Sequence, residues 1–117
     1  MNAEKRYFEF VRLPSFESTA KGILKEEEIR RMEEDLVANP WAGDLIAQSG
    51  GVRKLRVATE GRGKRGSTRV VYVYIEDRET IYLLFAFPKN MQANLTAAEK
   101  QQVRKLVAQI RGENRNA

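Results

Sequence analysis

Apolar residues in the first forty positions are spaced as one strand followed by two helices. Residues 6–13 have aromatic and β-branched side chains in near alternation with charged ones, which predicts a strand. Phe16, Ala20 and Ile23 then recur at the spacing of one helix face, so we expect a short helix that ends near Gly22.

A second helix is predicted from about Lys25 to Ala38. Its first turn has three consecutive glutamates, whose charges interact favourably with the positive end of the helix dipole. Its apolar residues form one stripe: Ile29, Met32, Leu36 and Val37. The helix should end at Asn39, because a residue that precedes proline avoids the helical region. We expect the two helices to form an antiparallel hairpin.

Three further strands are predicted at 52–58, 68–76 and 80–87. A polar, glycine-rich and basic loop at 59–67 separates the first two, and a polar turn at 76–79 separates the last two. The strands should therefore pair in antiparallel fashion. Alternation in the middle strand places Arg69, Val71, Val73 and Ile75 on one face, and Val70, Tyr72 and Tyr74 on the other.

The last predicted helix begins at the segment Thr96-Ala-Ala-Glu99, which has the spacing of a capping box. Its apolar residues again follow the helical repeat: Val103, Leu106, Val107 and Ile110. We expect the tail from Gly112 to be frayed.

This order of elements is typical of an α+β domain. We expect an antiparallel or mixed sheet of about four strands, with an N-terminal helix hairpin and a C-terminal helix. If the helices gather on one face, the other face is free for function, unless the last helix crosses it. The 117 residues fit a single domain, residues 1–117, with one core.

Composition excludes several kinds of chemistry. The chain has no cysteine and no histidine, which excludes disulfides, thiolate metal sites and histidine-based acid–base catalysis. No apolar run approaches the 18 or so residues that span a bilayer, and the first residues do not resemble a signal peptide. We expect a cytoplasmic protein without a membrane partner.

Positive charge is concentrated in one segment of the chain. Residues 53–69 contain seven basic residues and one acidic residue, a net charge of +6, whereas the whole chain has +5. The basic residues are Arg53, Lys54, Arg56, Arg62, Lys64, Arg65 and Arg69. A cluster of one sign indicates a polyanionic ligand, and nucleic acid is the first candidate.

The loop in this segment matches the pattern GxGxxG between Gly61 and Gly66. A dinucleotide site is rejected, because that motif requires a helix after the glycines and here a strand follows. Two interpretations remain, a flexible hairpin loop and a loop whose Arg62, Lys64 and Arg65 bind phosphates.

Arg69 and Lys89 are the candidate catalytic cations. Arg69 begins the most regular predicted strand, and Lys89 follows the strand that should lie beside it. Antiparallel pairing should bring the two close together, and a neighbouring cation lowers the pKa of a lysine. An arginine stays charged and suits stabilisation of a developing anion. Each residue is alternatively an ordinary solvated surface charge.

Three segments resemble HigB-type toxins of the RelE/ParE superfamily: GGVRKLRV at 50–57, GRGKRGSTRVVY at 61–72, and YLLFAFPKN at 82–90. Asn39-Pro40 with Gly43-Asp44, and the helix start at Leu95-Thr96, are also similar to that group. The resemblance extends from about residue 6 to residue 110, and 50–72 is its most specific part.

The resemblance implies a RelE-like fold and a metal-independent endoribonuclease without a cofactor. Such toxins enter the A site of the 30S ribosomal subunit, contact mRNA and rRNA, and cleave the mRNA. The ribose 2′-hydroxyl attacks the adjacent phosphate and leaves a 2′,3′-cyclic phosphate. The partner that neutralises the toxin is a cognate antitoxin, expected to have a helix-turn-helix domain.

Transferred to this chain, the resemblance assigns catalysis to four residues: Arg69, Lys89, Lys64 and Arg65. Four more should bind RNA or the ribosome: Arg53, Lys54, Arg56 and Arg62. The chain departs from the group in two respects. Pro88 precedes Lys89, at a position where small residues are common in the group. Many relatives have a tyrosine or histidine near the C-terminus, whereas no tyrosine follows Tyr82 here. The general base is therefore not identified.

Two alternatives to the nuclease follow from the same fold class. One is a ParE-like inhibitor of DNA gyrase, which has no need for a phosphate-binding active site. The other is a catalytically inactive domain that binds RNA or the ribosome, which the missing C-terminal tyrosine or histidine keeps open.

Overall fold

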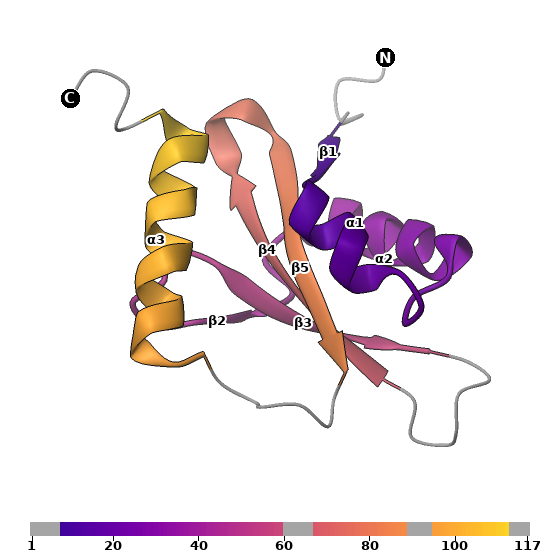
Figure 1. The fold of residues 1–117 in the computed structure, drawn as a ribbon. Coiled ribbons are helices and arrows are strands. Elements are labelled where there is room, and N and C mark those ends of the chain that lie inside the picture. Colours follow the sequence, from indigo (N-terminus) through magenta and orange to yellow (C-terminus); the bar gives the residue numbers. More distant parts are fainter. Residues whose placement is uncertain (1–7, 60–66, 89–94, 113–117) are drawn as a thin grey trace, which may run out of the picture.

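The protein, described here from a computed structural model, forms a five-stranded mixed sheet with helices on both of its faces (Figure 1). The structure describes residues 8–59, 67–88 and 95–112. The elements in chain order are β1 (Glu9–Arg12), α1 (Pro14–Ala20), α2 (Glu26–Ala38), β2 (Asp44–Leu45), β3 (Arg53–Ala58), β4 (Ser67–Ile75), the 3₁₀ turn η1 (Glu76–Arg78), β5 (Thr80–Pro88) and α3 (Ala97–Arg111). The predicted α+β class and mixed sheet are confirmed.

The strand order is β1-β5-β4-β3-β2, with β1 parallel to β5 and all other pairs antiparallel. The hairpin predicted for β4 and β5 is present, and β3 pairs with β4 as expected. The described part of the sheet has five strands where about four were expected. The additional strand, β2, has only two residues, too few to show an alternating pattern.

Helices cover both faces of the sheet, because α3 packs on the face that α1 and α2 leave free, which is the alternative that the sequence left open. Phe16 of α1 and Met32 of α2 join Tyr72 in one buried cluster. Val103 and Val107 of α3 join a second cluster on the opposite face, which contains Val71, Val73 and Ile75. Because both faces of β4 are apolar, each requires a covering layer.

The helices end close to the predicted positions. Helix α2 begins at Glu26, and the Glu28 carboxylate accepts a hydrogen bond from the Lys25 amide (2.8 Å). The capping box of α3 is confirmed, since Thr96 accepts from the Glu99 amide (3.1 Å) and Glu99 from the Thr96 amide (2.9 Å). Helix α1 ends at Ala20, before the predicted stop near Gly22.

Strand β5 contains a register shift that decides which way its side chains face. Val71 pairs with Phe85, but the next residue of β4, Tyr72, pairs with Leu83. Leu84 is therefore an extra residue, as in a β-bulge. Leu84 and Phe85 both pack in the cluster on the α3 side. Beyond this point, the side chains of β5 have exchanged faces.

Helix α1 covers the edge of β5 beyond the end of β1. The Ser15 hydroxyl donates a hydrogen bond to the Leu84 carbonyl oxygen (2.5 Å). The Thr19 hydroxyl accepts one from the Ala86 amide (2.9 Å). Backbone groups that β1 cannot reach are thus satisfied by side chains, which holds this end of β5 in place.

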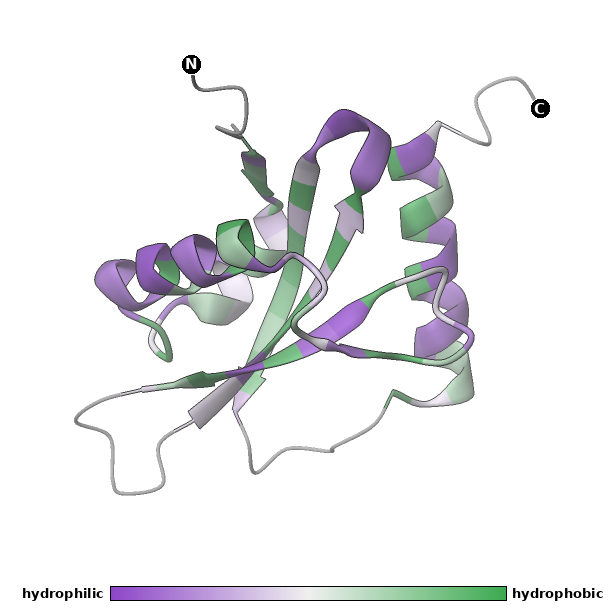
Figure 2. Cartoon of the chain, turned by 180° about the vertical axis from the view of Figure 1, so that it is seen from behind, coloured by the Kyte–Doolittle hydropathy of each residue, from purple (hydrophilic) through white to green (hydrophobic). Residues whose placement is uncertain are grey.

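Hydrophilic residues colour α2 and the turn between β4 and β5 in Figure 2. Arg12 of β1 bridges inward to α2, with its guanidinium 2.9 Å from the Glu33 carboxylate and 3.0 Å from that of Glu26. This arginine lowers the pKa of Glu26.

No helix within the described ranges is both long and apolar enough to cross a membrane.

Candidate active site

A row of two arginines and one phenylalanine crosses three strands on the α3 face of the sheet. Arg56 of β3 is the direct partner of Arg69 of β4, and Arg69 is in turn the direct partner of Phe87 of β5. Side chains of directly opposite residues share a face and lie close together. The predicted residues Arg56 and Arg69 are therefore neighbours.

Arg69 is partly buried and its guanidinium is not fully satisfied. Its Nη1 atom is buried and has no hydrogen-bond partner. The hydroxyl of Ser67, two residues away on the same strand, is likewise buried and unpaired. An unsatisfied buried polar group destabilises a fold by about 1–3 kcal/mol, so such groups are usually paired. Two unpaired groups side by side indicate a place where a ligand completes the hydrogen bonding.

Electrostatics favour an anionic ligand at the same place. Arg56 is exposed and lies directly opposite Arg69, so two positive charges are adjacent. Within the described part of the chain, no carboxylate forms a salt bridge with either of them. Like charges at opposite positions of a sheet repel each other, and a bound phosphate would relieve that repulsion.

Lys54 and Arg53, adjacent in β3, lie on opposite faces of the sheet. Lys54 is the partner of Val71 and faces α3, on the same side as Arg56. Arg53 faces the other way. Its guanidinium donates hydrogen bonds to the carbonyl oxygens of Gly43 (2.8 Å) and Trp41 (3.2 Å), and lies 5.3 Å from the centre of the Trp41 ring. The structure thus separates Arg53 from Lys54 and Arg56, which were predicted to bind RNA with it.

Four predicted site residues, Arg62, Lys64, Arg65 and Lys89, lie outside the described residues. The chain on either side of them is described. Ala58 is the partner of Ser67 at the last pair of β3 and β4, and Thr68 is the partner of Pro88 at the last pair of β4 and β5. The predicted approach of Lys89 to Arg69 remains a prediction.

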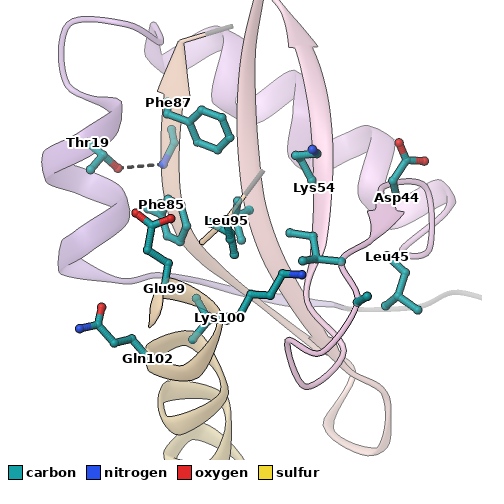
Figure 3. A pocket seen from close by; sticks show the side chains of 15 residues that line it. Thr19, Asp44, Leu45, Lys54, Phe85, Phe87, Leu95, Glu99, Lys100 and Gln102 are labelled. Carbon is teal, nitrogen blue, oxygen red and sulfur yellow. Dashed lines mark hydrogen bonds between the residues drawn. The ribbon is translucent and has the colours of Figure 1, made fainter. Parts of the chain in front are cut away.

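A groove of about 920 Å³ runs between this face of the sheet and the start of α3 (Figure 3). Its apolar lining includes Val71, Phe85, Phe87 and Leu95, and its polar lining includes Lys54, Lys100, Asp44 and Glu99. At the edge, Thr19 forms its hydrogen bond with the Ala86 amide (Figure 3). The described residues contain no group of three or more acidic side chains that could hold a metal ion.

Comparison with known proteins identifies the family. Residues 15–116 match the family model described as the RelE toxin of the RelE/RelB toxin–antitoxin system. The chain belongs to the RelE toxin family. Its fold is also similar to that of a double arginine-to-alanine mutant of the E. coli toxin RelE in the free state. That match has a TM-score of 0.52 and 11% sequence identity, and covers 87% of this chain and 98% of the other.

For a RelE toxin, the site has members that the sequence did not single out. The sequence predicts Ser67 at the end of a loop, whereas the structure begins β4 at this residue and so places it on the same face as Arg69. The sequence alone does not distinguish Phe85 and Phe87 from the other aromatic residues. Only the bulge at Leu84 places them on the face that also presents Arg69.

Proposed function

We propose that this RelE toxin is a ribosome-dependent endoribonuclease that cleaves mRNA in the A site of the 30S subunit. The observation that supports this most directly is the Arg56–Arg69 pair, with an unpaired buried nitrogen on Arg69 and no carboxylate partner among the described residues. This arrangement suits a phosphodiester whose charge increases as the ribose 2′-hydroxyl attacks it.

Each site residue has a proposed role. Arg69 stabilises the charge that develops on the scissile phosphate, and Arg56 binds the same backbone. Lys64 and Arg65 complete the charge stabilisation from the loop that precedes β4. Lys89 gives up or takes a proton at the ribose or the leaving oxygen. Lys54, Arg53 and Arg62 contact RNA of the message or the ribosome. The chemistry requires neither a metal nor a cofactor.

On this proposal, the toxin belongs to the HigB-type group and acts in the cytoplasm. A co-encoded antitoxin with a helix-turn-helix domain neutralises it. Its family membership in a toxin–antitoxin system supports the antitoxin partner. The sequence similarity at 50–57, 61–72 and 82–90 supports the HigB-type assignment.

Inhibition of DNA gyrase and simple RNA binding are the competing functions, and labelling of growing cells separates the three. The toxin is expressed from a repressible promoter, and the incorporation of labelled amino acid and labelled thymidine is followed over the first minutes. A ribosome-dependent nuclease stops protein synthesis first and depletes intact mRNA. If thymidine incorporation stops first, the result would support inhibition of DNA gyrase. If translation stops while mRNA remains intact, it would support a domain that binds RNA or the ribosome without cleaving RNA.

Arg69→Ala is expected to restore growth in that experiment while the protein still accumulates. Arg30→Ala is the matched control, because Arg30 is an exposed arginine of α2 whose one described ion pair, with Glu26, spans 3.8 Å. It should remain as toxic as the wild type. Full growth arrest by Arg69→Ala, at equal protein level, would remove Arg69 from the proposed site.

A further inference from the structure

The large apolar side chains that remain exposed lie close together in the sequence, around the connection from α2 to β2. In the part of the chain that the structure describes, they are Val37 (38% exposed), Trp41 (46%) and Leu45 (60%). Arg53 adjoins two of them, because its guanidinium lies 5.3 Å from the centre of the Trp41 ring and Leu45 is its direct strand partner. Trp41, Leu45 and Arg53 together form the Trp41 surface. Exposed apolar patches on folded proteins commonly mark a contact with another macromolecule.

Trp41 is nearly half exposed and yet is held from several sides. Its amide donates a hydrogen bond to the Asn39 side chain (3.1 Å), and its carbonyl oxygen accepts one from Arg53 (3.2 Å). Its ring packs edge-on against Tyr74, with the ring centres 4.9 Å apart and the planes at 72°. A side chain that is already ordered loses little conformational entropy when a partner covers it. Tryptophan and arginine are also among the residues that contribute most to the affinity of protein interfaces.

The charges near the Trp41 surface favour a basic partner. The last turn of α2 contains Asp35 and no basic residue. Glu34 and Asp35 are exposed, and neither forms an ion pair with another described residue. The carbonyl groups at the C-terminal end of a helix add a partial negative charge. Arg53 is positive, but its guanidinium already donates to the Trp41 and Gly43 carbonyl oxygens. This end of α2 therefore repels the phosphates of RNA and attracts basic side chains.

The Trp41 surface is separate from the proposed active site. Arg53 faces away from α3, whereas Arg56 and Arg69 lie on the face toward α3. Leu45 is in the edge strand β2 and borders the groove only from that edge. A partner can therefore cover Trp41 without contacting the arginine pair.

We propose that the Trp41 surface is the docking site of the antitoxin, which covers Trp41 with apolar side chains and places basic side chains near Asp35. The inference rests on the proposed function, because it takes the co-encoded antitoxin from there as the partner. A protein segment with both apolar and basic side chains matches Trp41 and the end of α2, whereas RNA matches Arg53 alone. An antitoxin bound here also covers Arg53, so it competes with the RNA contact that is proposed for this residue.

The first experiment compares antitoxin binding and toxicity for Trp41→Ser. The antitoxin probe is the product of the gene that adjoins the toxin gene in its operon. Binding is measured by titration calorimetry with full-length toxin that also carries Arg69→Ala, so that cells can produce it. We expect Trp41→Ser to raise the dissociation constant roughly thirty-fold. In the active toxin, Trp41→Ser should arrest growth like the wild type. Cells should not survive it at an antitoxin level that protects them from the wild type.

Asp35→Lys separates docking from a loss of fold. A lysine near the C-terminal end of a helix stabilises that helix, so this variant should unfold at the same urea concentration as the wild type or at a higher one. It should nevertheless raise the dissociation constant for the antitoxin about ten-fold, and the difference should shrink at high salt. Glu27→Lys is the matched control, because Glu27 is an exposed glutamate at the other end of α2. It should bind the antitoxin like the wild type.

Three results would overturn the proposal. If Trp41→Ser and Asp35→Lys leave antitoxin binding unchanged, the antitoxin docks elsewhere. If Glu27→Lys weakens binding as much as Asp35→Lys does, the antitoxin responds to the overall charge of α2 and not to the Trp41 surface. If Trp41→Ser weakens binding to ribosomes but not to the antitoxin, the surface binds RNA. All three leave the nuclease function intact. Failure of the wild type to cleave mRNA would overturn the proposed function instead, and calorimetry would still report on the docking site.

Discussion

At the scale of single residues, Arg69 at the proposed site destabilises the fold, whereas Tyr72 on the other face stabilises it. Arg69 has a buried unpaired nitrogen and a like charge directly opposite. Tyr72, on the other face, is fully satisfied. Its hydroxyl donates to the Pro40 carbonyl oxygen (2.8 Å) and accepts from the Gly43 amide (2.9 Å). Substitution of the two residues should therefore change the free energy of unfolding in opposite directions.

Arg69→Met is expected to leave the free energy of unfolding unchanged or to raise it by about 1 kcal/mol, because it removes an unpaired buried nitrogen and the repulsion from Arg56. Cleavage should nevertheless be lost. Urea denaturation followed by circular dichroism measures the first effect. A decrease of more than about 1 kcal/mol would indicate that Arg69 supports the fold.

Tyr72→Phe is expected to lower the free energy of unfolding by about 1–3 kcal/mol, because it leaves the Gly43 amide and the Pro40 carbonyl without their partner. Gly43 is packed closely against this tyrosine, since a Cβ atom there would lie 2.9 Å from the Tyr72 ring and from the Lys54 carbonyl oxygen. Urea denaturation at neutral pH measures the loss. An unchanged midpoint and slope would show that the hydroxyl contributes nothing.

The same tyrosine predicts a loss of stability in alkali. Burial raises the pKa of Tyr72, so the unfolded chain releases this proton first as the pH rises past the ordinary value of about 10. The free energy of unfolding contributed by Tyr72 is therefore complete below that pH and falls above it. Between pH 9 and 11, roughly, the wild type should lose more stability than Tyr72→Phe. Parallel curves would contradict a raised pKa.

At the scale of elements, local patterns predicted most strands and helices but not how they join. Strands β4 and β5 are apolar runs long enough to recognise, and α3 has a complete capping box. The parallel pairing of β1 with β5 has no local pattern, because it joins residues about 70 positions apart. Helix α3 packs on the apolar face of the sheet that α1 and α2 leave uncovered. Which face that is depends on the assembled sheet, and no local pattern in α3 shows it.

The bulge in β5 shows why the site was only partly predictable. Simple alternation would place Phe85 and Phe87 with Ile81 and Leu83, on the face covered by α1 and α2. Leu84 reverses the order, and both phenylalanines face α3 instead. By contrast, Arg56 and Arg69 were found from charge and strand position alone, because no irregularity interrupts the pairs between β3 and β4.

Thr19→Val should loosen this end of β5 without disturbing the rest of the sheet. Valine has nearly the same shape but cannot accept the hydrogen bond of the Ala86 amide, which would lose its partner. We expect faster hydrogen exchange at the Ala86 amide and a loss of about 1 kcal/mol in the free energy of unfolding. The amides of β3 serve as the internal reference. Unchanged exchange at Ala86 would mean that α1 does not hold this edge.

At the scale of the whole molecule, the two faces of the sheet differ in how completely the helices cover them. The face toward α1 and α2 encloses an apolar cluster around Tyr72 and Leu36. The face toward α3 is closed near Val107 and opens into the groove near Phe87. The C-terminal end of α3 is fixed by Arg78, whose guanidinium donates to the Ile110 (2.8 Å) and Arg111 (3.2 Å) carbonyl oxygens. One face thus provides stability while the other presents charge and a cavity.

The measurement that tests the proposed function most directly is primer extension on a reporter mRNA in a cell-free translation reaction. Wild-type protein and Arg69→Ala are compared with and without ribosomes. We predict cuts at in-frame codon positions with the wild type, which require ribosomes and disappear with Arg69→Ala. Intact mRNA with the wild type, or cuts that persist without ribosomes or with Arg69→Ala, would contradict a ribosome-dependent nuclease centred on Arg69.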